Sequence, residues 1–317
     1  MPQKIDNKTT PPARVELLEI APEEAGQRLD NFLKRVRPGV PKTRIYRAIR
    51  KGEVRINRSR CKPDARLMAG DQLRIPPLQA AERSPATGAS QWQERLRRAI
   101  LLEEQSLLAI NKPSGLAVHG GSGVSVGLIE TLRSMYANDR YLELVHRLDR
   151  DTSGVILVAR RAATLRTLHE MLRTDGMDKR YLCLVSGRWP AHLKQVDAPL
   201  EKFSLASGER RVKVSASGRR ALTQFRVVQR LAGATLVEAK PVTGRTHQIR
   251  VHCQHAGFPI LGDVKYAGDA ADELTEQLGV KRLFLHAHQL NFTLDTGRYE
   301  LVAPLPDDLQ AVLDGGS

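Results

Sequence analysis

The sequence is poor in cysteine, with three in 317 residues, at Cys61, Cys183 and Cys253. They lie far apart and form no CxxC pair, so neither a disulfide framework nor a zinc knuckle is expected. The N-terminal segment lacks the apolar core of a signal peptide. No stretch approaches the roughly 18 apolar residues that a membrane span requires. These absences favour a soluble protein of the reducing cytoplasm.

Cofactor-binding motifs are also missing. The glycine-rich segments NKPSGLAVHGGSG and GDVKYAG match neither GxGxxG nor the P-loop pattern GxxxxGK[ST], so no nucleotide cofactor is expected. His247, His252, His255 and Cys253 are close in sequence, but no HExxH motif or nearby carboxylate completes a ligand set. A metal site is therefore not expected either, and any chemistry must come from side chains alone.

Acidic residues are in the minority, with 35 Asp and Glu against 50 Lys and Arg, which gives a net charge of +15. The excess is localised, because residues 1–76 contain 18 Lys and Arg but nine Asp and Glu. Such a concentration of positive charge attracts polyanions, so nucleic acid is the first partner to consider.

The N-terminal region has a clear helical pattern. Residues 1–20 are expected to form a flexible tail that includes a short strand-like segment, VELLEI. Apolar spacing predicts one helix over residues 29–36 and a second from Pro41 to Gly52. The second helix carries basic residues on the face away from its isoleucines, suited to binding phosphates unless they form a merely solvated face. They are Lys42, Arg44, Arg47 and Lys51.

The chain is long enough for two domains. Residues 77–94, rich in Ala, Pro, Ser and Gly, are interpreted as a linker between a domain at 21–76 and a larger one at 95–317. In the larger part, apolar strand-like segments such as SGVILVA and LFLHAHQLNF are interrupted by four helical stretches, near 125–137, 161–174, 246–256 and 271–279. This mixture indicates an α+β fold built on an extended mixed β-sheet.

Two polar clusters are candidates for chemistry. In VHRLDRDTSGVILVA, Asp149 lies between Arg147 and Arg150 at the edge of a predicted strand, where a carboxylate can act as nucleophile or base. In KPVTGRTHQIRVHCQHAG, Arg245 precedes a predicted helix and could meet a carboxylate from elsewhere. By spacing alone, a surface salt-bridge turn is the preferred interpretation of the first cluster.

The sequence resembles two known families. RLDNFLKRVRPGVPKTRIYRAIRKGEVRINRSRCKPDARLMAGDQLRIP looks like the alpha-L RNA-binding motif. Five further segments, in the same order along the chain, resemble the large-subunit pseudouridine synthases of the RluA family, over residues 24 to about 306. They are NKPSGLAVHGG, HRLDRDTSG, KRYLCLVSG, VTGRTHQIRVHCQHAGFPILGD and LFLHAHQL.

The resemblance implies a role for each motif residue. Asp149 would be the catalytic aspartate, Tyr181 would stack on the target base, and Arg245 would pair with the aspartate. Arg147 would fill the gap left by a flipped nucleotide, and Lys112 is expected among the RNA-binding residues. The implied reaction converts specific uridines of large-subunit (23S) ribosomal RNA, or its assembly precursor, to pseudouridine without a cofactor, in a protein expected to be monomeric.

Two other functions compete with this interpretation. A non-catalytic RNA-binding factor of ribosome assembly would explain the charge and the alpha-L motif equally well. A glycosylase or nucleosidase would also attack the bond between sugar and base with a carboxylate, but it would release the base to water. The position of Asp149 relative to an arginine distinguishes the first rival, and the reaction products distinguish the second.

Overall fold

The computed structural model describes residues 14–37, 40–78, 89–120, 126–139 and 141–315. The chain divides into two compact units, Met1–Ala86 and Thr87–Ser317. Each unit is described by itself. Within the described ranges, no helix has the length and apolar character needed to cross a membrane.

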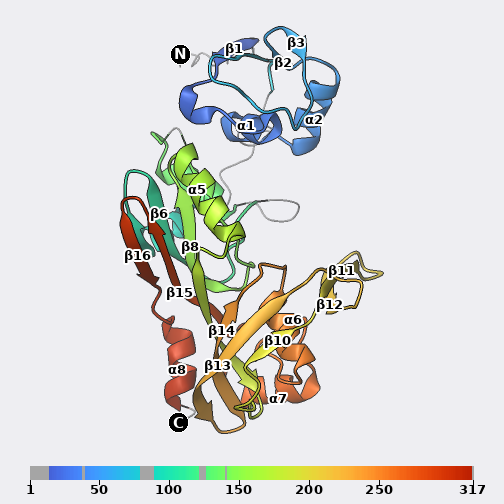
Figure 1. The fold of residues 1–317 in the computed structure, drawn as a ribbon, viewed down its shortest axis with the longest axis vertical. Coiled ribbons are helices and arrows are strands. Elements are labelled where there is room, and N and C mark those ends of the chain that lie inside the picture. Colours follow the sequence, from blue (N-terminus) through green and yellow to red (C-terminus); the bar gives the residue numbers. More distant parts are fainter. Residues whose placement is uncertain (1–13, 38–39, 79–88, 121–125, 140, 316–317) are drawn as a thin grey trace, which may run out of the picture. The chain divides into compact units, whose positions relative to one another are not determined.

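The N-terminal unit combines two short helices with a small sheet (Figure 1). Helix α1 spans Leu29–Val36 and α2 spans Lys42–Arg50, which confirms both predicted helices. Apolar residues from both helices, including Phe32 and Ile45, are fully buried in one core. The unit also contains the 3-10 helix η1 (Pro22–Glu24) and strands β1 (Glu16–Glu19), β2 (Arg55–Ile56), β3 (Ser59–Arg60) and β4 (Gln72–Ile75).

The sheet of this unit corrects the predicted tail. Its strand order is β1-β4-β2-β3, and Leu17 of β1 is paired with Arg74 of β4 in antiparallel register. Residues 16–19 therefore belong to the folded unit, which confirms the strand predicted for VELLEI and corrects the flexible tail predicted for residues 1–20. Residues 1–13 of that segment lie outside the described residues.

The second unit contains one extended mixed sheet, with the path β10-β13-β14-β9-β15-β8-β6-β5 and with β16 and β7 paired to β15 and β8. This architecture confirms the predicted α+β class. Its strands are β5 (Ile100–Glu103), β6 (Leu107–Lys112), β7 (Glu143–Leu144), β8 (Ser153–Ala159), β9 (Asp178–Ser186), β10 (Gln195–Asp197), β13 (Leu222–Leu231), β14 (Ala234–Pro241), β15 (Leu285–Leu294) and β16 (Gly297–Val302). Its helices are α3 (Ala89–Arg98), α4 (Leu128–Met135), α5 (Ala162–Arg173), α6 (Gln248–His255), α7 (Asp269–Gln277) and α8 (Asp307–Gly315).

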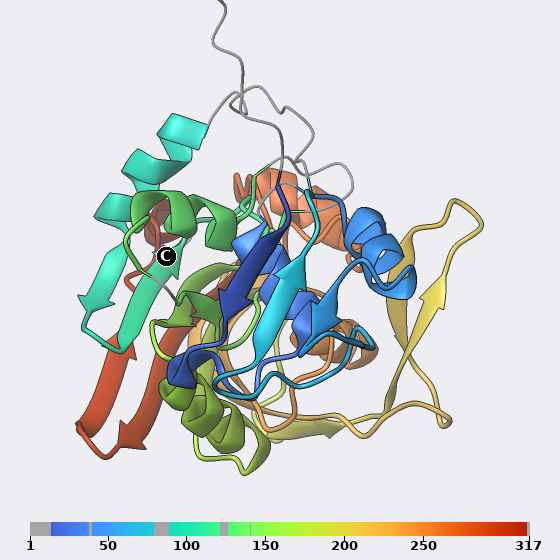
Figure 2. The same ribbon diagram turned by 90° about the horizontal axis from the view of Figure 1, so that it is seen from above.

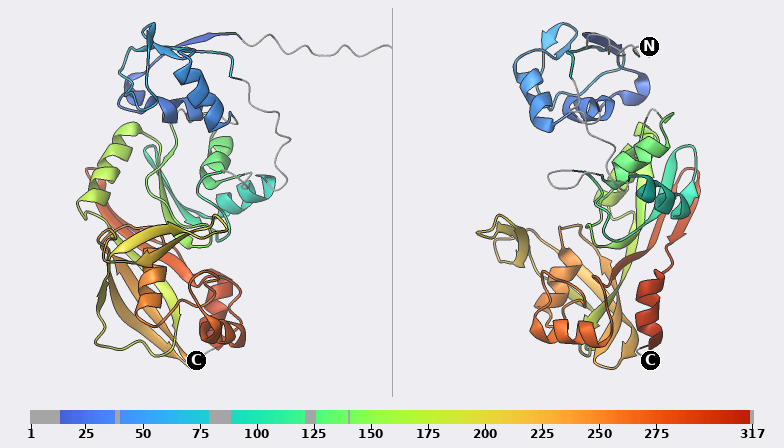
Figure 3. Two further views of the ribbon diagram at one scale, coloured as in Figure 1. Left: turned by 90° about the vertical axis from the view of Figure 1, so that its right-hand side faces the viewer. Right: turned by 180° about the vertical axis from the view of Figure 1, so that it is seen from behind.

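Helices cover both faces of the sheet around β6 and β8. Alternate residues of a strand point to opposite faces. Accordingly, Ile156 and Val158 of β8 join the core beneath α3 and α4, whereas Val155 and Leu157 join the core beneath α5. Figure 3 (left) shows α5 on one side of these strands and the α3–α4 pair on the other. Because β8 is buried on both faces, it reads in sequence as an unbroken apolar run.

Two parts of this unit differ from the sequence-based prediction. Helix α3 starts at Ala89, so residues 89–94 of the predicted linker are helical, while residues 79–88 lie outside the described ranges. Strands β11 (Leu200–Ser204) and β12 (Arg210–Val214) form a hairpin that was not predicted. Figures 1 and 2 both show this hairpin projecting from the rest of its unit.

Candidate active site

The proposed catalytic aspartate lies on the loop between β7 and β8. The loop turns back where the Thr152 backbone N–H donates to the Asp149 carbonyl at 3.3 Å. Ser114 Oγ donates to the Asp151 carbonyl at 2.7 Å, and the Gly115 N–H donates to the Arg150 carbonyl at 2.9 Å. The HRLDRDTSG and NKPSG motifs, nearly forty residues apart in sequence, therefore form one structure, in which the second motif fixes the backbone that carries Asp149.

Lys112 holds the same loop from inside the protein, which corrects its expected role. Its side chain is fully buried, and Nζ donates to the carbonyls of Pro113, Leu116 and Arg150 at 2.9, 2.9 and 3.0 Å. Burial lowers the pKa of Lys112 to about 7, against the nearby negative charges of Asp151 and Asp149. A buried amine whose donors meet backbone carbonyls does not contact RNA, so Lys112 supports the loop instead.

A glycine makes the strand after the loop fit its neighbour. Gly154 of β8 lies opposite Ala287 of β15 in the parallel pair that joins the two halves of the sheet. Its φ is +114°, and a Cβ there would lie 2.2 Å from the Ala287 carbonyl oxygen. Any larger residue would separate β8 from β15 immediately beside the Asp149 loop, because both the backbone angle and the space exclude a side chain.

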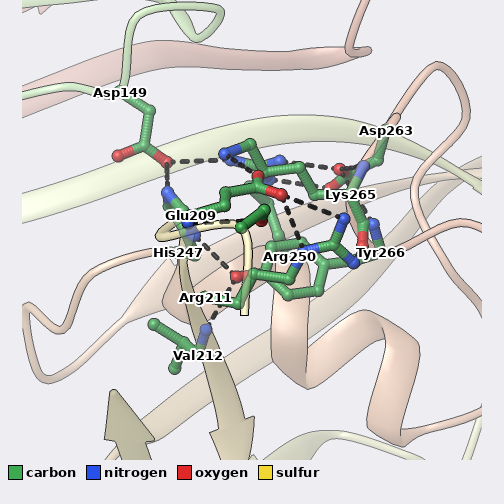
Figure 4. A network of polar contacts seen from close by, with 10 residues as sticks. Asp149, Glu209, Arg211, Val212, His247, Arg250, Asp263, Lys265 and Tyr266 are labelled. Carbon is green, nitrogen blue, oxygen red and sulfur yellow. Dashed lines mark hydrogen bonds and ion pairs between the residues drawn. The ribbon is translucent and has the colours of Figure 1, made fainter. Parts of the chain in front are cut away.

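Asp149 is accessible and lies beside a buried arginine (Figure 4). Its side chain is 26% exposed, and Oδ2 lies 3.4 Å from Arg250 Nη1. Arg250 donates through Nε and Nη2 to the two carboxylate oxygens of Asp263, at 2.7 and 2.6 Å. Burial opposes the charge of Arg250, but Asp263 and Asp149 raise its pKa. The guanidinium is therefore fixed as a cation beside the Asp149 carboxylate.

Arg245 does not occupy the position predicted for it. Its Nε donates to the Arg220 carbonyl at 3.1 Å, and the guanidinium beside Asp149 belongs to Arg250, five residues further along the same motif. Arg245 precedes α6, whereas Arg250 lies inside this helix among buried residues. The sequence did contain a signal, because a charge within a buried helix needs a partner and GDVKYAG supplies Asp263.

Tyr181 is the residue for which the resemblance predicts base stacking, a role that stays a prediction. It lies on β9, is partly buried, and packs against the cores on both sides of the junction between the sheet halves. Burial raises the pKa of its phenol, and the negative charge of Asp149 raises it further. The aspartate whose charge acts on this phenol lies 32 residues earlier in the sequence.

The other predicted RNA-binding residues, apart from the buried Lys112, are exposed. Arg147 lies two residues before Asp149 on the same loop, with its side chain at the surface. In the N-terminal unit, the four basic residues of the α2 stripe are also exposed: Lys42, Arg44, Arg47 and Lys51. Their exposure makes them available to a partner, and their role in binding RNA stays a prediction.

The histidines considered as metal ligands have other partners. His252 is buried, and its ring nitrogens bond Thr223 Oγ1 at 2.9 Å and the Ala198 carbonyl at 3.0 Å. Cys253 is buried beside Cys183, while His255 is exposed at the end of α6. His247 lies instead at the active site, with Nε2 3.8 Å from Asp149 Oδ2. In the described ranges, no group of three or more His, Cys, Asp or Glu side chains is arranged to hold a metal ion.

Comparison with known proteins agrees with this geometry. Residues 106–255 match the family model described as RNA pseudouridylate synthase, and residues 27–73 match the S4 domain. The first match contains Asp149, Tyr181 and Arg250. The chain belongs to the RNA pseudouridylate synthase family.

Relatives and solved structures extend this match to almost the whole chain. It is 55% identical over 290 residues to ribosomal large subunit pseudouridine synthase C of Salmonella typhimurium, covering 90% of this chain and 91% of that protein. It is 53% identical to the protein of the same name from Escherichia coli K12, covering 96% and 98%. The structure of human RNA pseudouridylate synthase domain containing 4 matches with a TM-score of 0.60 and 28% identity, over 72% of this chain and 96% of that one.

These findings confirm the fold and the type of reaction. The chain is an isomerase with a pseudouridine synthase fold and an N-terminal S4 domain, which is the alpha-L motif predicted from sequence. They also favour catalysis over the rival interpretation as a non-catalytic RNA-binding factor. If the protein is an enzyme, the sequence requires Asp149 to lie beside an arginine. Asp149 does lie beside a guanidinium, although this group belongs to Arg250.

Proposed function

We propose that the protein converts specific uridines of large-subunit (23S) ribosomal RNA to pseudouridine, with Asp149 as the catalytic residue. The observation that carries this proposal is a partly exposed carboxylate beside a buried, doubly paired arginine. The names of the relatives support the large ribosomal subunit as the source of substrate, and the similarity extends over both the S4 domain and the synthase domain. RNA from assembling large subunits is the corresponding physiological partner.

The reaction needs no redox step and no net consumption of water. The bond between ribose C1′ and uracil N1 breaks, and its electron pair leaves with the base. The base then turns and C5 bonds to C1′, after which C5 loses its proton and N1 gains one, so that the product is an isomer of uridine. While the base is detached, the ribose is electron-poor, and the Asp149 carboxylate can stabilise it by direct attack or by its charge. The Arg250 guanidinium, 3.4 Å away, orients the carboxylate.

Tyr181 supplies an aromatic face for the detached base. Stacking of a base on an aromatic side chain contributes about 1 to 3 kcal/mol and does not depend on which base is bound. Retention of uracil is essential here, since a base that diffused away would leave an abasic site. Tyr181 therefore favours isomerisation over the glycosylase outcome.

The exposed loop and the N-terminal unit would bind the RNA around the target. A uridine within folded RNA must leave its stack, which costs about a few kcal/mol, and an inserted side chain offsets part of that cost. We assign this insertion to Arg147, because it is exposed on the Asp149 loop. The α2 stripe would hold phosphates elsewhere on the RNA without reading sequence. We place this activity in the cytoplasm, in a monomer, whose mass in solution can be checked by light scattering.

Release of tritium from RNA labelled at uridine C5 tests the proposal. We expect purified protein to release tritium from 23S ribosomal RNA and Asp149→Asn to stop the release while RNA binding persists. Unchanged release by Asp149→Asn would remove the assignment of the catalytic residue. Free uracil together with abasic RNA would identify a glycosylase.

A deletion strain tests the substrate. Pseudouridine mapping of its ribosomal RNA is expected to show that particular 23S positions remain as uridine and regain the modification on complementation. Loss of sites in the small-subunit RNA alone would contradict the proposed substrate.

A further inference from the structure

His247 has an unusual backbone conformation beside the catalytic aspartate. It caps α6 with φ 54° and ψ 19°, in the left-handed region that residues other than glycine rarely adopt. Such a conformation is retained where the surrounding structure requires a particular side-chain direction. Here it directs the imidazole between Asp149, with Nε2 3.8 Å from Oδ2, and Tyr266, whose Oη lies 2.7 Å from Nδ1 (Figure 4).

The hydrogen bonds of Tyr266 define the protonation of this ring. The Val212 backbone N–H points to Tyr266 Oη at 3.0 Å, and a backbone amide can only donate. Among the hydrogen bonds of the described residues, the acceptor left for the Tyr266 proton is His247 Nδ1. The single proton of a neutral imidazole then sits on Nε2, which faces Asp149. Burial lowers the pKa of His247, against the nearby charge of Asp149, and so favours this neutral form.

We propose that His247 is a positioning residue for the reaction: Tyr266 holds it with its proton on Nε2, and this N–H restrains the same Asp149 oxygen, Oδ2, that faces Arg250. The inference rests on the proposed function, since it concerns the same aspartate. Asp149 Oδ2 lies 3.4 Å from Arg250 Nη1 and 3.8 Å from His247 Nε2, so neither contact is short. The orientation of the carboxylate therefore depends on both neighbours together. A carboxylate held from two directions keeps the rotamer in which it meets ribose C1′.

The same contacts connect the active site to the β11–β12 hairpin. Val212, the donor to Tyr266, lies on β12. The loop that carries Tyr266 also binds the hairpin through Lys265, whose Nζ lies 2.6 Å from Glu209 and whose carbonyl accepts from Arg211 Nη1 at 2.9 Å. The Tyr266 ring in turn lies 5.0 Å from the Arg250 guanidinium carbon. A shift of the hairpin would therefore move both groups that hold Asp149.

Substitutions at position 247 separate the side chain from the backbone. His247→Gly removes the ring and adopts a positive φ without strain, so the fold is retained. We expect its kcat for tritium release to fall about tenfold while KM changes less than twofold, because the variant loses an electrostatic contact that orients Asp149 without losing a group that binds RNA. His247→Gln restores an N–H donor and should recover most of the kcat. His255→Ala, on the exposed end of the same helix, is the matched control and should equal wild type.

Tyr266→Phe tests the chain of contacts. It keeps the ring beside Arg250 but removes the hydroxyl, so kcat should fall as in His247→Gly. The double variant should be no slower than either single one, because both break the same path. Nitrogen-15 NMR of the wild-type protein should show His247 Nδ1 unprotonated and Nε2 protonated, and Tyr266→Phe should lose this preference.

Several outcomes would overturn the inference without affecting the proposed function. They are wild-type kcat in His247→Gly while Asp149→Asn is inactive, a His247→Gln variant as slow as His247→Gly, strictly additive losses in the double variant, or a proton on Nδ1. Failure of the wild-type protein to release tritium would instead remove the proposed function and this inference with it.

Discussion

Two aspartates, one in each unit, show how the same side chain serves structure in one place and chemistry in another. Asp30 in the N-terminal unit is 4% exposed. It accepts from Arg28 at 3.0 and 2.9 Å and from the Tyr46 hydroxyl at 2.6 Å. Asp149 in the synthase unit is 26% exposed, with its neighbours at 3.4 and 3.8 Å. The Asp30 carboxylate has its hydrogen-bonding capacity filled by neighbouring side chains, while the Asp149 carboxylate can still accept a hydrogen bond from a substrate or contact it directly.

The basic residues show the opposite contrast. The Arg250 side chain is 5% exposed and is held by two hydrogen bonds to Asp263, so its guanidinium has one fixed orientation. In the N-terminal unit, Lys42 and Arg44 are exposed in the first turn of α2, where the helix dipole disfavours cations and no acidic residue compensates. A bound phosphate would relieve this conflict. In the proposed function, the exposed charges of the N-terminal unit would contribute to RNA affinity, and the oriented charges of the synthase unit would contribute to the reaction.

The largest expected effect follows from removal of the oriented charge. Arg250→Met should lower kcat about 100-fold to 1000-fold, because the carboxylate loses its guanidinium and Asp263 is left buried without its partner. Arg250→Lys keeps a positive charge beside the buried Asp263 and should therefore fold. A loss of kcat in this variant would reflect the reaction and not misfolding. Arg245→Met is the matched control in the same motif. Equal losses in the Arg245 and Arg250 variants, measured by tritium release, would contradict the assignment.

Next in size is the strand junction that carries Asp149. Gly154→Ala should destabilise the synthase unit by about 3 to 5 kcal/mol, because it adds backbone strain to a collision with Ala287. Gly115 has φ +84° and open space around it, so Gly115→Ala should add backbone strain alone and destabilise the synthase unit by about 1 to 2 kcal/mol. Thermal denaturation of the two variants should differ clearly, and similar melting temperatures would show that the junction tolerates a side chain.

A smaller effect is expected from the structural aspartate. Burial alone would raise the pKa of Asp30, but its bonds to Arg28 and Tyr46 lower it to about 2 from 3.8. The charged form therefore stabilises the N-terminal unit by about 2 kcal/mol. This contribution is present above pH 4 and is lost as the pH falls through about 2.

Asp30→Asn should remove that stabilisation at neutral pH and leave the reaction itself intact. Hydrogen exchange of the α1 and α2 amides in the full-length protein should show faster opening at pH 7, with a difference from wild type that shrinks toward pH 2. Unchanged protection of these amides from exchange at pH 7 would mean that the charged Asp30 carboxylate does not stabilise the packing of α1 on α2. A fall in kcat would contradict the division of roles between the two units.

The smallest effect concerns the exposed stripe. Replacing Lys42, Arg44, Arg47 and Lys51 by Gln should raise KM about tenfold near physiological salt, flatten the salt dependence of RNA binding and leave kcat unchanged. The control removes the same charge from exposed arginines that pair with neighbouring acids in the synthase unit: Arg97, Arg98, Arg173 and Arg298. A fall in kcat, or equal effects in both variants, would show that the stripe is not the phosphate-binding surface.

Much of the local structure was predictable from sequence. The spacing of Leu29, Phe32 and Leu33 defined α1, and the unbroken apolar run after the HRLDRDTSG motif marked the central strand β8. The hairpin β11–β12 was missed because its strands are short and carry many charges. The helical start at Ala89 was missed because alanine, proline and glycine around it resemble a linker.

The sequence by itself determined most of the helices and strands, because apolar periodicity is a local property, and its resemblance to a known family pointed to Asp149 and Tyr181 as site residues. Tertiary structure alone decided which arginine meets Asp149, since the left-handed turn at His247 places Arg250 of α6, and not Arg245, beside the carboxylate. It also decided that Lys112 is buried and that Tyr266 reaches both His247 and the hairpin. Side-chain direction in three dimensions depends on how distant segments pack, and no spacing along one segment contains that information.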